Sequence, residues 1–198
     1  MRYHEHPNKN WAAMPNNTTN SYNNMTAGDK VLASFLREVG NNTNTTYGQG
    51  GSSATVWMAR WALVYKYDYS SQADEDPWNY DRIKCNVLNK LPVFISGWGK
   101  KNGLIVKDGH SYVIDGVQYI DKKYRNIQCN YEYKRRTELL HYNFGWNGGW
   151  DGWFSQSIAD YPAYNGTDIY FIDKDVITGY LFPNFQYNKN AIYDIKPN

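Results

Sequence analysis

The sequence contains no long hydrophobic run, and this absence excludes the simplest kind of membrane protein. Polar residues interrupt every apolar stretch before it reaches the length that a transmembrane helix requires. The first residues, Met1 to Pro7, have no apolar core of the kind found in a signal peptide. We therefore expect no membrane-spanning segment in this sequence and no membrane partner.

Cysteine is scarce as well. The two cysteines, Cys85 and Cys129, are too few for a disulfide framework, and they show no CxxC spacing. A zinc site and a thioredoxin-like redox site are therefore not indicated. His4 and His6 form a His-x-His pair, but two ligands are too few for a metal site. We expect no metal and no cofactor.

Charge of one sign is not in excess either. The chain has 21 basic and 19 acidic residues, a formal net charge of +2. This near balance does not supply the positive field on which nucleic-acid binding depends, so no nucleic-acid partner is expected. The longest basic run, Lys134-Arg135-Arg136, is predicted to be solvated surface at the tip of a hairpin.

What the sequence does have is aromatic and apolar material for a folded core. Hydrophobic residues make up 41% of the 198 residues, enough for one substantial domain covering 1–198. The 19 tyrosines and 8 tryptophans favour sheet over helix, because broad rings pack well on pleated surfaces.

The first 90 residues carry the helix patterns. Thr26 is predicted to cap a helix with Asp29 at its third position, and Gly40 to end it. Its apolar stripe comprises Val31, Leu32, Phe35, Leu36 and Val39. A second helix is predicted from Ala54 to about Tyr65, capped by Ser52 or Ser53, after the glycine-rich loop Tyr47 to Ser53.

A third helix is predicted from Trp78 to Lys90, with Ile83, Val87 and Leu88 on one face. From Pro92 onward the pattern changes to strands. These are Val93 to Ile95, His110 to Asp115, Val117 to Ile120, Leu139 to Phe144, Trp153-Phe154, and Ala191 to Ile195. Helices in 1–90 followed by an antiparallel sheet in 91–198 predict an α+β fold.

Two segments of the predicted sheet carry candidate chemistry. Gly109-His110-Ser111-Tyr112-Val113-Ile114-Asp115-Gly116 puts a histidine at a strand start, after a glycine that admits a close backbone, and ends in an Asp-Gly turn. His141 to Gly152 is a strand leading into a loop rich in Trp and Gly. Antiparallel pairing would bring Asn143 or Trp146 next to His110. On the residues alone, a histidine at a strand end is more often structural than catalytic.

These segments resemble the paired signatures of the streptopain family, a bacterial branch of the papain-like cysteine proteases. The family pattern reads Gly-His-Ala-Phe-Val-Ile-Asp-Gly, then Asn-Trp-Gly-Trp-Gly-Gly followed shortly by Asp-Gly. Further stretches are similar in the same order: Tyr47-Gly48, Leu91 to Phe94 with Gly97-Trp98-Gly99, and Tyr187 to Pro197. The resemblance extends over nearly the whole chain and implies a papain-like fold.

The resemblance also implies roles for individual residues. His110 matches the catalytic imidazole, Trp146 matches the tryptophan that covers it, and Asn143 matches the asparagine that orders the following loop. The implied substrate cleft contains Gly97, Trp98, Gly109 and Phe144. Two positions depart from the pattern, since Phe144 and Asn147 stand where the family has tryptophan and glycine. A phenyl ring shields an imidazole but has no indole N–H to donate.

The family's nucleophilic cysteine has no counterpart here. Met1 to Pro7 resembles the exit of the family's cysteine helix, which would put the cysteine about nine residues before Met1, roughly two and a half helical turns. The central cysteine helix is thus expected to be mostly missing. Ser52 and Ser53 align with a different loop, and neither Cys85 nor Cys129 begins a helix that would activate a thiolate.

The resemblance implies a cysteine endopeptidase, with a protein or peptide substrate, an inhibitory propeptide or cognate inhibitor, and a secreted or cell-surface location in a bacterium. A catalytically inactive peptide-binding protein of the same fold is one alternative. A carbohydrate-binding β domain is another, suggested by the many Trp and Tyr side chains, and it would require several coplanar exposed rings.

Overall fold

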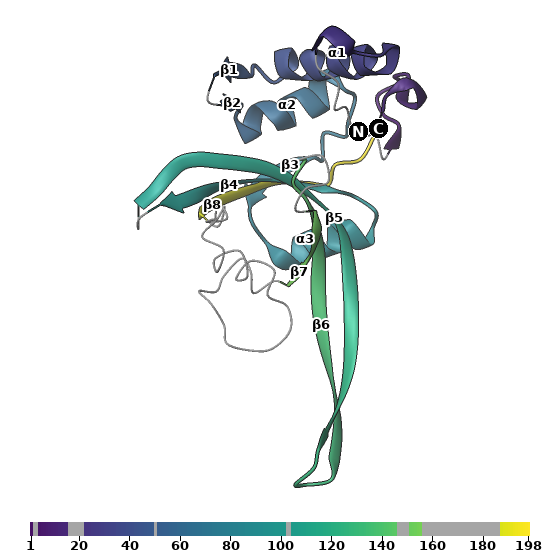
Figure 1. The fold of residues 1–198 in the computed structure, drawn as a ribbon, viewed down its shortest axis with the longest axis vertical. Helices are drawn as coiled ribbons and strands as arrows, with labels where there is room; N and C mark the ends of the chain where they lie inside the picture. The colour runs from purple at the N-terminus through teal and green to yellow at the C-terminus, as the bar shows by residue number, and fades with distance from the viewer. Residues whose placement is uncertain (2–3, 16–21, 50, 102–103, 146–150, 156–186) are drawn as a thin grey trace. The chain divides into compact units, whose positions relative to one another are not determined.

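The computed structural model describes residues 1, 4–15, 22–49, 51–101, 104–145, 151–155 and 187–198. These ranges contain three α-helices, short 3-10 turns and eight strands (Figure 1). The chain forms two compact units, Met1–Glu75 with Asp194–Asn198, and Asp76–Tyr193. The fold is α+β, as the sequence predicts. No helix of the described ranges has the length and apolarity needed to cross a bilayer.

Helix α1 (Ala27–Asn42) begins with the predicted capping box. The Asp29 amide donates to the Thr26 hydroxyl over 3.2 Å, and the Thr26 amide donates to the Asp29 carboxylate over 2.8 Å. These two bonds satisfy amides that the first helical turn leaves without an intrahelical partner. The helix continues two residues past Gly40, and its stripe is narrower than predicted, because Phe35 is buried whereas Leu36 is 58% exposed.

Helix α2 (Val56–Lys66) is capped by Thr55, whose hydroxyl accepts from the Met58 amide over 3.1 Å. The prediction of Ser52 or Ser53 as the cap is wrong. Those serines belong to β2 (Gly51–Ser53), which pairs antiparallel with β1 (Thr46–Gly48). The glycine-rich segment is therefore a small hairpin, and the helix begins only after its extended backbone ends.

The amino-terminal segment is anchored to the same compact unit through His6. The imidazole Nε2 lies 2.6 Å from the carbonyl oxygen of Tyr67, and the ring meets Tyr69 edge-on at a centroid distance of 4.9 Å. Tyr69 is fully buried, which raises the pKa of its phenol to about 12. His6 thus supports the packing of this unit.

The second unit is built on a six-stranded sheet in the order β3-β8-β4-β5-β6-β7. The strands are β3 (Asp74–Pro77), β4 (Val93–Lys101), β5 (Leu104–Asn126), β6 (Tyr131–Asn143), β7 (Gly152–Ser155) and β8 (Tyr187–Tyr193). Strand β4 pairs antiparallel with both β5 and β8, and β6 pairs antiparallel with both β5 and β7. The predicted sheet is present, with longer strands than the sequence pattern indicates.

The Asp115-Gly116 pair does not form the predicted turn. Strand β5 continues through this pair, and its register with β6 shifts between Ile114 and Gly116. An extra residue in one strand is a β-bulge, which bends the strand without ending it. The hairpin turn comes eleven residues later, at 127–130, so Lys134 to Arg136 lies within β6 and not at the tip.

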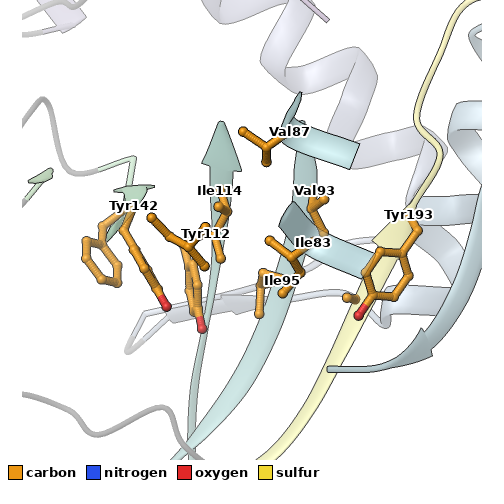
Figure 2. Close-up of a cluster of buried hydrophobic side chains, with 11 residues drawn as sticks. Ile83, Val87, Val93, Ile95, Tyr112, Ile114, Tyr142 and Tyr193 are labelled. Atoms are coloured by element: carbon orange, nitrogen blue, oxygen red, sulfur yellow. The ribbon is translucent and has the colours of Figure 1, made fainter. Parts of the chain in front are cut away.

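Helix α3 (Tyr80–Leu88) contacts the sheet and completes its core (Figure 2). Ile83 and Val87 are buried as predicted, but Leu88 is 55% exposed, so its assignment to the same face is wrong. The core that they join comprises Val93, Ile95, Tyr112, Ile114, Leu140, Tyr142, Phe144, Ala191 and Tyr193. The helix belongs to the compact unit that contains the sheet.

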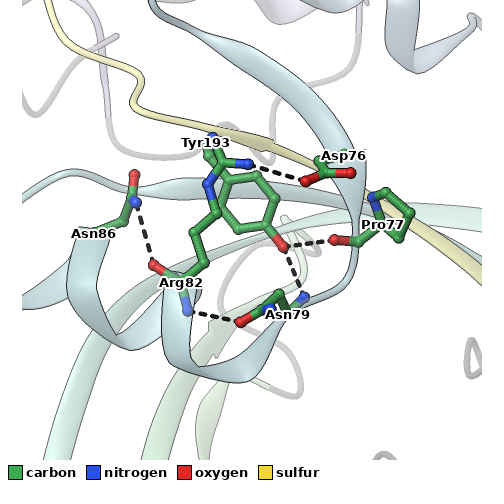
Figure 3. Close-up of polar contacts among 6 residues, drawn as sticks. All are labelled: Asp76, Pro77, Asn79, Arg82, Asn86 and Tyr193. Atoms are coloured by element: carbon green, nitrogen blue, oxygen red, sulfur yellow. Dashed lines mark hydrogen bonds and ion pairs between the residues drawn. The ribbon is translucent and has the colours of Figure 1, made fainter.

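Polar contacts fix the start of α3 against β8 (Figure 3). The Tyr193 hydroxyl accepts from the Asn79 amide over 2.8 Å and donates to the Pro77 carbonyl over 2.9 Å. The Arg82 guanidinium lies 4.1 Å from the Tyr193 ring centroid and bonds Asp76 over 3.1 Å. Asn79 caps the helix, which explains why α3 begins two residues after the predicted start.

Candidate active site

His110 lies on β5, half-buried, at a position that the neighbouring strand leaves open. Side chains alternate between the two faces of a strand, so His110 shares a face with the buried Tyr112 and Ile114. The residue opposite it on β4 is Gly97, and the preceding pair is Trp98 with Gly109. Local structure therefore puts the imidazole at the end of a buried aromatic row, beside a glycine that has no side chain.

The imidazole is oriented by a backbone carbonyl. The Nε2 atom of His110 lies 2.8 Å from the carbonyl oxygen of Phe144. A carbonyl oxygen only accepts, so Nε2 carries the hydrogen in this bond. When the imidazole is neutral, its lone pair then lies on Nδ1.

Phe144 is itself held firmly. Its amide donates to the Asp151 carboxylate over 2.8 Å, and its ring is only 8% exposed. The ring packs on Tyr112 at a centroid distance of 5.2 Å and on Phe154 at 6.3 Å. Because the carbonyl position follows from the backbone, the bond to His110 does not require the indole donor that the family pattern has at this position.

Asn143 shapes the turn that follows β6. It pairs with Val113 at the end of the β5–β6 ladder. Its side-chain oxygen accepts from the Gly145 amide over 3.0 Å, a local bond of the type that asparagine makes in turns. Gly145 has a φ of 73°, which glycine adopts without strain. This turn presents the Phe144 carbonyl to His110. Trp146 and Asn147 lie outside the described residues.

The predicted cleft residues of β4 and β5 form a close backbone contact. A Cβ on Gly109 would lie 3.1 Å from the Gly97 carbonyl oxygen and 3.8 Å from the Trp98 ring. Such a contact is tighter than ordinary van der Waals packing, so a side chain at 109 would push on β4. Trp98, which pairs with Gly109, is 37% exposed and lies beside this close contact between the two strands.

An imidazole–carboxylate pair elsewhere on the sheet was not found by sequence reasoning. The Nδ1 atom of His141 lies 2.6 Å from the Asp115 carboxylate, and its ring is 5.0 Å from the Trp153 ring. His141 alternates with the buried Leu140 and Tyr142, so it faces away from the side that holds His110. The only local signal for this pair was Asp115-Gly116, which has the composition of a turn. The structure shows that this dipeptide forms a bulge instead.

Asp151 is the other residue that sequence reasoning did not assign. It belongs to the Asp-Gly pair that follows the Trp/Gly loop, so a signal was present in the motif. Its role as acceptor for the Phe144 amide emerges only from the folded turn.

Neither cysteine lies beside the imidazole. Cys85 is exposed on α3, two residues from each of the buried Ile83 and Val87, and therefore on the side of the helix that faces away from the sheet. Cys129 is exposed in the hairpin turn, roughly 50 Å along β5 from His110 at about 3.3 Å per residue. Within the described ranges, no cluster of three or more metal-ligating side chains occurs.

The comparison with protein families identifies the family of the chain. The model of the Peptidase C10 family matches residues 1–154, and the chain belongs to this family, the streptopain family of cysteine peptidases. Membership implies a hydrolase of the cysteine-peptidase type. A comparison with curated proteins found no match.

Proposed function

We propose that the protein acts as a cysteine endopeptidase in which His110 is the general base and general acid. The bond from Nε2 to the Phe144 carbonyl is the observation that carries the proposal. It fixes the ring and leaves Nδ1 as the atom that exchanges the proton. The same carbonyl stabilises the imidazolium, because a charged donor makes a stronger bond than a neutral one.

The proposed chemistry proceeds through an acyl-enzyme. Nδ1 of His110 takes the thiol proton, and the thiolate attacks the carbonyl carbon of the scissile peptide bond. As the C–N bond breaks, the imidazolium returns the proton to the leaving amine. Water, deprotonated by Nδ1, then hydrolyses the thioester and regenerates the thiol. Cys85 and Cys129 are not assigned as the nucleophile, because neither lies beside the imidazole.

The remaining site residues have supporting roles in this proposal. Asn143 and Asp151 hold the turn that presents the Phe144 carbonyl, and the resemblance assigns to Trp146 the role of covering the imidazole. Gly97, Trp98 and Gly109 form the substrate side, a role that the resemblance to the family implies. Export from the cell and control by an inhibitory propeptide or cognate inhibitor belong to the same proposal.

Peptide hydrolysis tests this function. The protein, produced with any in-frame residues encoded upstream of Met1, is assayed on a fluorogenic protein substrate with and without a thiol-alkylating reagent. Loss of general acid–base catalysis in His110→Ala should lower kcat by about 10²- to 10⁴-fold. His141→Ala is the matched control, because that imidazole lies on the opposite face, and it should stay within about threefold of wild type.

Two results would count against the proposal. Hydrolysis that survives alkylation would show that no thiolate is involved. Equal losses in His110→Ala and His141→Ala would show that the assay reports on folding. Absence of hydrolysis in every form, with peptide binding retained, would favour the catalytically inactive peptide-binding alternative.

A further inference from the structure

The β5–β6 hairpin continues well past the rest of the sheet (Figure 1). Pairing of β4 with β5 ends at Ile114, and pairing of β7 with β6 ends at Leu139. Strands β5 and β6 nevertheless remain paired as far as Asn126 and Tyr131. We call residues 119–137 the hairpin arm. Its two outer edges pair with no strand of the described ranges.

The hairpin arm concentrates the positive charge of the protein. It contains six basic and two acidic residues, a net charge of +4, whereas the whole chain carries +2. Lys123 and Lys134 are directly opposite each other in the ladder, and both side chains are exposed. Like charges at directly opposed positions destabilise a strand pair. An anionic group bound between these lysines would relieve that repulsion.

One face of the hairpin arm carries a stack of tyrosines. Tyr124 and Tyr133 are directly opposite, with ring centroids 5.3 Å apart and planes inclined by 17°. Tyr131 continues the stack at 6.3 Å and 12° from Tyr133. All three rings are exposed, by 39%, 45% and 63% for Tyr124, Tyr133 and Tyr131. They form a rigid surface that the sheet does not bury.

The geometry of the stack narrows the kind of partner. Near-parallel rings at 5.3 Å are offset-stacked, so they partly cover each other's faces. Sugars and nucleobases stack on open ring faces. Because these rings partly cover each other, the stack favours neither a sugar nor a nucleobase as the bound partner. Ring edges and hydroxyls combined with basic side chains are instead typical of protein interfaces, where Tyr and Arg are enriched. Two copies of this arm would repel each other, because each carries +4.

We propose that the hairpin arm is an exosite that recruits acidic segments of polypeptide substrates. Because side chains alternate between the two faces of a strand, Lys123 and Lys134 lie on the face of the hairpin arm opposite the tyrosine stack. Carboxylates of the substrate bind the two lysines, and the same peptide crosses an unpaired edge of the arm to contact the tyrosine stack. The identity of the occupant as a polypeptide rests on the proposed peptidase function. The arm raises the local concentration of substrate and takes no part in bond cleavage.

The test is binding of a labelled twelve-residue peptide of alternating Glu and Ser, followed by fluorescence anisotropy on the His110→Ala full chain. Binding is expected, and Lys123→Glu with Lys134→Glu should weaken it at least about tenfold, because two attractions become repulsions. This double variant keeps a like-charge pair in the ladder, so its folding is matched to wild type. Tyr131→Ala with Tyr133→Ala should weaken binding about threefold or more without changing charge.

The matched control is Lys30→Glu with Lys66→Glu, which changes the net charge equally at two exposed lysines outside the arm. It should leave peptide binding within about twofold. The proposal would be overturned if this control weakened binding equally, or if the parent chain did not bind the peptide. It would also be overturned if a single-stranded oligonucleotide or a uronic-acid polysaccharide bound more tightly than the peptide. Because anisotropy requires no hydrolysis, failure of this site is distinguishable from failure of the proposed peptidase function.

Discussion

The Nε2 atom of His110 and the backbone carbonyl oxygen of Phe144 lie 2.8 Å apart, although the residues are 34 positions apart in the sequence. The contact joins the two segments that resemble the streptopain signatures. It depends on the turn formed by Asn143, on the Asp151 carboxylate and on the burial of the Phe144 ring.

Removal of the Asp151 carboxylate should misplace the Phe144 carbonyl. In Asp151→Ala the buried Phe144 amide loses its acceptor, and the ring of His110 loses a fixed partner. We expect kcat to fall at least about tenfold with KM nearly unchanged. Asp151→Asn should restore most of the loss, because an amide oxygen also accepts, whereas a purely electrostatic role would predict no rescue. Asp81→Asn, in the first turn of α3, is the control acid.

Restoring the family residue at 144 should affect stability more than activity. Phe144→Trp inserts a larger ring among Tyr112, Tyr142 and Phe154, and overpacking of a core costs about 1–3 kcal/mol. The carbonyl that binds His110 is unchanged, so kcat should stay within about threefold. Urea unfolding and steady-state hydrolysis measure the two effects. A large gain in kcat would mean that the missing indole N–H matters for catalysis.

The start of α2 can be checked by a pair of substitutions. Thr55→Ala removes the hydroxyl that accepts from the Met58 amide and should lower the free energy of unfolding by about 1 kcal/mol. Ser53→Ala changes an exposed strand residue and should stay within about 0.5 kcal/mol of wild type. Denaturant unfolding of both variants gives the comparison. A larger loss of stability in Ser53→Ala than in Thr55→Ala would indicate that the helix cap lies in the glycine-rich segment.

Acid should weaken the link between α3 and β6. The hydrogen bond from Lys84, followed by that from Tyr80, lowers the pKa of the Glu138 carboxyl below its ordinary value of 4.5. A lowered folded-state pKa contributes stability above the unfolded-state pKa, and that stability disappears as the pH falls through the folded-state value. Wild type should therefore lose more stability than Glu138→Gln between pH 7 and pH 3. Parallel pH curves for the two proteins would contradict this.

Local sequence determined some of these features and long-range pairing determined others. The Thr26–Asp29 capping box spans three residues, and Ile83 and Val87 share a helix face at a spacing of four, so both were predictable. Asp115-Gly116 has the composition of a turn, but the register of β5 with β6 turns it into a bulge. The Asp115–His141 pair follows from that register and was missed for the same reason.

The same limit applies to the candidate site. The motifs bring the strands of His110 and Asn143 together, and the structure places these strands side by side. The motifs do not tell which atom faces the imidazole, because a backbone carbonyl has no residue signature. The roles of Phe144 and Asp151 thus depend on the shape of one turn, which only the folded chain defines.

The tautomer of His110 tests the central claim most directly. Nitrogen-15 NMR of histidine-labelled protein, at a pH where the imidazole is neutral, distinguishes a protonated Nε2 from a protonated Nδ1, and His110→Ala assigns the signal. The account predicts a proton on Nε2, bound to the Phe144 carbonyl, with the lone pair on Nδ1. A proton on Nδ1 would contradict it, because the ring could then neither donate to Phe144 nor take a thiol proton at Nδ1.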